Sequence, residues 1–198
     1  MILTELTTVP DATLPVQALK TQLRLGTGFG EDTLQDGLLA GVLRAAIAAI
    51  EGRIGKVLLQ HRFSLRIEDW KSLDEQPLPV APVAQIVSVS LVDRAGGQTL
   101  VAADRYRLVP DTHRPHLAAT GLLFPMVPSD GHVEVVLDAG FGATWGAVPG
   151  DLAQAVLFLA ATYYEERHET HEQAAGLPHG VVALIERWRT VRVLGGGL

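Results

Sequence analysis

Apolar residues recur at helical spacing in the first third of the chain. Between residues 33 and 54 they are spaced three, four or seven apart, which places them on one face of a helix. These positions are Leu34, Leu38, Leu39, Val42, Leu43, Ala46, Ile47, Ile50 and Ile54. Asp32 is the predicted N-cap of this helix, and Gly55 marks its end. A shorter helix is expected to begin at Pro15, because proline fits a first helical turn.

From about residue 60 the period of the pattern changes to two. Apolar and polar residues alternate over 63–67, 87–91 and 133–137, which is typical of strands with one buried face. The segment 93–97 has the composition of a hairpin turn. We expect roughly four to six short strands in this middle section.

Helical spacing returns after Pro149, and the predicted helix runs to about Glu172. A loop with Gly176 and Pro178 then leads to a final helix that contains Trp188. This order predicts an α+β fold in which a helical bundle, made of two N-terminal and two C-terminal helices, is interrupted by a β-rich lobe. The predicted segments are 1–60 for the N-terminal helices, 61–140 for the inserted lobe, and 141–198 for the C-terminal helices and tail. The first and last segments are expected to form one structural unit.

Composition narrows the classes of function. Hydrophobic residues make up 47% of the chain and charged residues 19%, yet no apolar run is long enough to span a membrane, so apolar surface is expected to meet other subunits. The first residues carry acids and lack the pattern of a signal peptide, which predicts folding in the cytoplasm. The absence of cysteine excludes disulfides and thiol chemistry. The net charge of -6 argues against tight wrapping of DNA but allows DNA to pass.

The only metal-like cluster in the sequence is centred on His168 and His171, with acidic neighbours such as Glu165. Helical neighbours of this kind can share a metal ion, and His179 could add a ligand. The spacing differs from HExxH, whose histidines stand four apart. The cluster can therefore be interpreted as the site of a metal-dependent enzyme or of a metal-stabilised module. The simpler interpretation is that these residues form the solvated end of a helix.

No motif for catalysis or for a cofactor has the required spacing. The glycines between residues 26 and 30 follow a GxGxG pattern without the lysine of a phosphate-binding loop, and no GxSxG elbow is present. We therefore expect no catalytic residues and no cofactor.

Several segments, taken in order, resemble the phage head-tail connector (adaptor) family, found in tailed phages and phage-derived gene transfer agents. The segments are LPVQALKTQLRL, EDTLQDGLLAGVLRAAIAAIEGRIGKVLLQHRF, LPVAPVAQIVSVSLVD, VEVVLDAGFG, VPGDLAQAVLFLAATYYEERHE and LPHGVVALIERWRTVRV. The family usually has Thr-Gly-Arg near the end of the long helix, where this chain has Glu51, Gly52 and Arg53.

The resemblance implies a structural subunit at the head-tail interface of a virion or phage-like particle, assembled in the bacterial cytoplasm. It implies a homo-oligomeric ring, most often a dodecamer, that docks on the portal protein, meets a stopper or tail-completion protein, and surrounds a channel for double-stranded DNA. No membrane partner is implied. A stopper or tail-completion protein is an alternative role, and an infectious phage and a gene transfer agent both remain open.

The C-terminal segment is the predicted portal-docking site. Its arginines can donate charge-assisted hydrogen bonds to carboxylates, while its aliphatic residues supply apolar contact. The residues are Arg187, Trp188, Arg189, Val191, Arg192, Val193 and Leu194. At helical spacing Trp188 is expected to face the core and the arginines to point outward. DNA contact and an ordinary solvated face are the alternatives.

Overall fold

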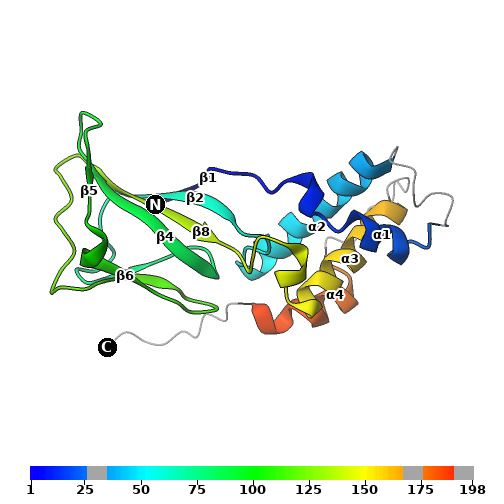
Figure 1. Cartoon of the computed structure of the whole chain (residues 1–198). Helices are drawn as coiled ribbons and strands as arrows, with labels where there is room; N and C mark the ends of the chain where they lie inside the picture. The colour runs from blue at the N-terminus through cyan, green and yellow to red at the C-terminus, as the bar shows by residue number, and fades with distance from the viewer. Residues whose placement is uncertain (26–34, 167–175, 190–198) are drawn as a thin grey trace. The chain divides into compact units, whose positions relative to one another are not determined.

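The computed structural model describes residues 1–25, 35–166 and 176–189 (Figure 1). The chain forms two compact units. The β unit comprises residues 1–10 and 56–147, and the helical unit comprises 11–55 and the described residues from 148 onward. None of the helices among the described residues combines the length and apolarity needed to cross a membrane.

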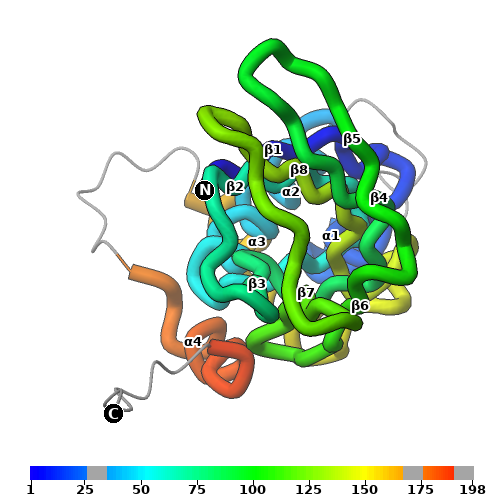
Figure 2. Tube along the Cα trace, turned by 90° about the vertical axis from the view of Figure 1, so that its left-hand side faces the viewer, coloured from blue at the N-terminus to red at the C-terminus, as the bar shows by residue number. Residues whose placement is uncertain are grey.

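A five-stranded antiparallel sheet dominates the β unit, with the strand order β1-β2-β8-β4-β5. Its strands are β1 (Ile2–Glu5), β2 (His61–Ile67), β8 (His132–Ala139), β4 (Val83–Val92) and β5 (Gln98–Leu100). A second, three-stranded sheet has the order β3-β7-β6 (Figure 2). Its strands are β3 (Glu75–Pro77), β7 (His116–Ala119) and β6 (Tyr106–Val109). Single 3-10 turns occur at Ala103–Arg105 and Trp145–Ala147.

The core of the β unit grows from the alternating residues of its central strands. Phe63 and Leu65 in β2 stand opposite Leu137 and Val135 in β8, and all four are buried. On the other side of β8, Val89 of β4 stands opposite Val135. Cross-strand pairs of this kind are the main stabilising contacts of a sheet. The strands predicted at 63–67, 87–91 and 133–137 are thereby confirmed.

One polar cluster, centred on the buried Asp138, lies beside this core. Asp138 in β8 stands opposite Arg62 in β2 and Gln85 in β4. Arg62 donates from Nε and Nη2 to the two carboxylate oxygens at 2.8 and 3.1 Å, and Gln85 Nε2 donates to Oδ2 at 2.7 Å. The Arg62 hydrogen bonds hold the pKa of Asp138 below its usual range, and they outweigh the burial that would raise it. The cluster therefore ties the three central strands together by their side chains.

The helical unit contains α1 (Val16–Gln22), α2 (Asp36–Ile54), α3 (Gly150–Glu165) and α4 (His179–Ile185), and 3-10 turns at Asp11–Thr13 and Glu186–Trp188. Helix α3 contacts each of the other three helices, and α1 also contacts α2. Buried aliphatic residues of α2 and α3 supply the core, and Leu39, Leu43, Ile50 and Ile54 are buried as the spacing predicted. Leu38, which was predicted on the same face, is 48% exposed. Lys20 of α1 is buried and forms an ion pair with Asp36 of α2 at 2.6 Å.

The mixed α+β class is confirmed, but several boundaries differ from the prediction. Ile2–Glu5 pairs with β2, so the start of the predicted segment 1–60 belongs to the β unit. The middle section contains seven strands among the described residues, β2 to β8, more than the four to six expected there. The additional strands are short edge or second-sheet strands such as β5, in which every residue is exposed, so no alternation marks them. Helix α3 ends at Glu165, before the predicted Glu172, and the predicted N-cap Asp32 lies outside the described residues.

Asp138→Asn is expected to lower the free energy of unfolding by about 1–3 kcal/mol, because the buried side chain loses its charge-assisted hydrogen bonds to Arg62. The lowered pKa of Asp138 makes its contribution present above the pKa of the unfolded chain and lost as the pH falls through the folded pKa. Urea unfolding at neutral and acidic pH, followed by circular dichroism, measures both effects. The control is Asp130→Asn, whose ion pair with Arg94 is exposed and 3.5 Å long. An equal loss in both variants would contradict the assignment.

Candidate interaction site at the C-terminal helix

Asp151 is the residue around which the C-terminal helical turns are organised. It is the second residue of α3, directly after Pro149 and Gly150, where a negative charge is favoured by the helix dipole. Its Oδ1 accepts a hydrogen bond from the backbone N–H of Leu152 at 3.0 Å. Its other oxygen, Oδ2, is left to receive donors from elsewhere in the fold.

Those donors come from the end of the described chain. Trp188 Nε1 donates to Asp151 Oδ2 at 2.7 Å, and Arg187 Nε reaches the same oxygen at 2.7 Å. The guanidinium carbon of Arg187 also lies 4.8 Å from the centre of the Trp188 ring, which is a cation–π distance. One carboxylate thus holds an arginine and a tryptophan that stack on each other, and it attaches the turn at 186–188 to the start of α3.

The electrostatics of Asp151 follow from these contacts. Burial by itself would raise the pKa of the carboxyl, but the hydrogen bonds from Trp188 and Arg187 act in the opposite direction, and the net result is a pKa below the ordinary value. The carboxylate is therefore charged at neutral pH, and it keeps both donors in place.

Arg189 ends the described part of the chain. Its Nη1 donates to both carboxylate oxygens of Glu186 at 3.1 Å. Its backbone is extended, with φ -68° and ψ 134°, so the helical turns stop there. The chain beyond this point starts from a position that Trp188 and Asp151 fix.

This geometry changes the roles of the predicted docking residues. Arg187, Trp188 and Arg189 all have partners within the helical unit, and Trp188 is half-buried against Asp151 instead of facing the core. The structure therefore places these three at the root of the C-terminal segment. The other predicted docking residues, Val191, Arg192, Val193 and Leu194, lie outside the described residues.

Sequence reasoning missed Asp151 as the partner of Trp188. The two residues stand 37 positions apart, and neither carries a local motif that points to the other. An acid in the first turn of a predicted helix was the only available signal, and it indicates a helix N-terminus without naming a tertiary partner.

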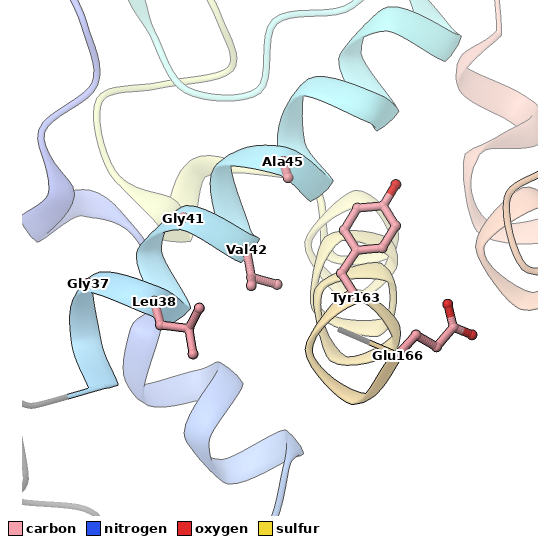
Figure 3. A pocket seen from close by; sticks show the side chains of 7 residues that line it. All are labelled: Gly37, Leu38, Gly41, Val42, Ala45, Tyr163 and Glu166. Atoms are coloured by element: carbon pink, nitrogen blue, oxygen red, sulfur yellow. The ribbon is translucent and has the colours of Figure 1, made fainter. Parts of the chain in front are cut away.

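A groove of about 480 Å³ lies on α2 and α3 within the helical unit (Figure 3). Gly37, Gly41 and Ala45 line it as a row of small residues on α2, and Leu38 and Val42 lie beside that row. Tyr163 and Glu166 line it from the other helix, and Leu38 is 48% exposed. The groove offers apolar surface with one carboxylate at its edge.

The predicted metal candidates His168 and His171 lie outside the described residues. Across 1–25, 35–166 and 176–189, no group of three or more histidines and carboxylates is placed to hold a metal ion.

Comparison with known proteins gives a match among solved structures. No protein-family model matches the chain, and no curated protein matches it. A chain in the neck of an empty gene transfer agent (GTA) particle computed with C6 symmetry is 54% identical, with a TM-score of 0.90 and 99% of each chain covered. A chain in the virion of a native GTA particle is also 54% identical, with a TM-score of 0.87 and the same coverage. The chain belongs to this family of GTA particle proteins.

A third GTA structure extends the agreement. In the neck of a native GTA particle computed with C12 symmetry, a chain is 51% identical, with a TM-score of 0.85 and 99% of each chain covered. The GTA match spans the β unit and the helical unit alike, because almost the whole length aligns. The resemblance to proteins of phage-like particles that the sequence motifs indicated is confirmed at this level.

Trp188→Phe is expected to keep an aromatic, smaller ring but remove the Nε1 donor, and to lower the free energy of unfolding of this GTA-family chain by about 0.5–1.5 kcal/mol. Chemical denaturation followed by circular dichroism measures the change. Arg189→Ala is the matched control, because it breaks only an exposed contact with Glu186 one helical turn away. If the two variants were equally stable, the Asp151 contact would not hold the C-terminal root.

Gly41→Ala is expected to raise the free energy of unfolding by about 0.5–1 kcal/mol, because alanine loses less backbone entropy in a helix interior. A Cβ at Gly41 would meet nothing within 4 Å, so the groove can take the added methyl group. Gly55→Ala is the contrasting variant, since Gly55 has a left-handed φ of +67° at the C-cap of α2 and alanine is strained there. A destabilised Gly41→Ala variant would show that the groove is closed in solution.

Proposed function

We propose that the chain is a structural head-tail connector, or adaptor, subunit that forms a ring between the portal and the tail of a GTA-type or phage particle. The observation that carries the proposal is the full-length similarity, at 51–54% identity, to chains found in GTA necks. Particle-associated chains of this kind are building blocks, and we accordingly infer no enzymatic activity and no cofactor for this chain.

The proposed ring has twelve subunits. A neck computed with C12 symmetry requires each chain that obeys the symmetry to occur in multiples of twelve, and a twelvefold ring also satisfies C6 symmetry. The two GTA necks computed with C6 and C12 symmetry are therefore both compatible with a dodecamer. In the proposed ring, the helices of segments 1–60 and 141–198 act as one bundle, and the β lobe of 61–140 is an insertion in it.

The charge of the chain suits the proposed DNA channel. The net charge is -6, and a negatively charged surface does not bind the phosphate backbone tightly. Tight binding would slow the passage of double-stranded DNA. We infer that the ring surrounds the channel without binding DNA tightly. A stopper or tail-completion protein is the expected partner on the tail side.

The C-terminal segment is the proposed arm that reaches the portal. Its root is held by the Trp188–Asp151 hydrogen bond, and the backbone is extended at Arg189. Beyond the root, Arg192 can pair with portal carboxylates, and Val191, Val193 and Leu194 can supply apolar contact.

Truncation after Arg189 is expected to leave the fold intact, because the Asp151 contacts remain, while attachment of tails fails. Heads filled with DNA should then accumulate without tails in electron micrographs of the particles. A chain that ends at Leu194 is the matched control, since it loses only Gly195, Gly196, Gly197 and Leu198 and keeps all the proposed docking residues. Normal tailed particles from the chain ending at Arg189 would refute the portal-docking role.

The double variant His168→Ala/His171→Ala is expected to assemble into normal particles, because the proposed function uses no metal. Counting tailed particles and measuring the metal content of the purified protein by mass spectrometry tests this. Loss of a stoichiometric metal together with failed assembly would instead support the metal-dependent alternative.

A further inference from the structure

The loop between β7 and β8 carries the most exposed large apolar side chains among the described residues. Leu122 is 92% exposed and Met126 is 90% exposed. Leu123 in the same loop is 51% exposed, and Leu73, from the segment before β3, is 69% exposed. We call Leu73, Leu122, Leu123 and Met126 the apolar platform. Leu73, Leu123 and Met126 line one hollow, and Leu122 is the chain neighbour of Leu123. Exposed apolar side chains this close together mark an interaction site.

The platform is built on a fixed base. The ring of Phe124 stacks on Trp70, with centroids 4.1 Å apart and planes 16° from parallel. Trp70 Nε1 donates to the carbonyl of Pro125 at 2.9 Å, and the Phe124 N–H donates to the carbonyl of Leu73 at 2.8 Å. The two segments that carry the platform are thus bonded to each other, and little loop entropy is left to lose on binding.

Beside the platform lies a hollow of about 700 Å³, lined by residues 68–73, 123–128, 130 and 131. Leu73, Leu123 and Met126 contribute to its lining, and charged residues such as Asp69, Lys71 and Asp130 also border it. Protein–protein interfaces combine apolar and charged residues of these kinds. The four platform residues carry no charge, so they are unsuited to contact DNA phosphates.

We propose that the apolar platform is one half of the contact between neighbouring copies of this chain in the ring. The inference rests on the proposed function. A closed ring needs the same two-sided contact at every subunit, and permanent contacts of this kind have apolar centres. The platform supplies such a centre, already held in shape, and a second copy is the one partner that every subunit of a ring must have.

Site-specific cross-linking identifies the partner directly. The photoreactive residue p-benzoylphenylalanine replaces Leu122 in particles assembled with the full chain, and the products are sized after irradiation. The expected product is a dimer of two 21.2 kDa chains. The same probe at Leu100, which is also exposed but lies in β5 outside the platform, should give less of that dimer. A cross-link from position 122 to a different protein of the particle, or none at all, would overturn the proposal.

A double substitution tests the energetics of the platform. Leu122→Ser/Met126→Ser changes side chains that are almost fully exposed in the subunit, so the fold should be unaffected, which thermal unfolding checks. Association of copies should weaken about tenfold or more, as expected for loss of an interface anchor. Leu100→Ser is the matched control, because Leu100 is also exposed, at 69%, but lies in β5.

The outcomes separate this inference from the proposed function. If the double variant and the control assemble rings as well as the unaltered chain does, the platform is not the contact between copies, and the adaptor role stands. If the unaltered chain itself joins no ring in the particle, the proposed function fails first, and the platform proposal fails with it.

Discussion

The pairing of β8 with β2 is the interaction that allows one chain to build both units. Strand β2 begins soon after α2 ends, and β8 ends shortly before α3 begins, so the pair His61 and Ala139 brings the entry and exit of the β segment together. Backbone hydrogen bonds continue this closure: the Gln60 N–H donates to the carbonyl of Gly142 at 2.8 Å. In the helical unit, α2 and α3 are in contact as well, so both units depend on the same two stretches of chain.

The closure leaves no room for a side chain at one position. Gly140 has φ +131°, and a Cβ there would lie 2.5 Å from the backbone of Gln60. Only glycine fits so close an approach. The buried Asp138, two residues earlier, adds side-chain hydrogen bonds to both neighbouring strands. A small number of residues at the end of β8 therefore holds this strand to its two neighbours, β2 and β4.

Sequence patterns predicted the strands and helices that have one buried face and one exposed face. The alternation at Phe63 and Leu65 and at Val135 and Leu137 is visible because one face of the strands is buried. Strands β1 and β5 escaped prediction because backbone pairing defines them and their side chains are mostly exposed. The same limit applies to the contacts of Asp151, since tertiary hydrogen bonds between residues distant in sequence leave no periodic pattern.

The two surfaces with a proposed role differ in how they are built. The C-terminal root is polar and held by a charged carboxylate, which suits an anchor whose attached segment does the binding. The apolar platform is uncharged and is stabilised by the stack of Trp70 on Phe124, which suits a permanent interface. The proposed adaptor role would use both kinds of contact, one within the ring and one to a different protein.

The most direct test of the account is native mass spectrometry of the full chain mixed with the portal protein of its particle. If the chain is an adaptor, it should form a closed cyclic complex with the portal protein, with equal numbers of the two proteins. This result is expected whether or not the chain is a monomer before mixing. Two folded proteins that remain separate under conditions in which the portal itself forms its ring would contradict it.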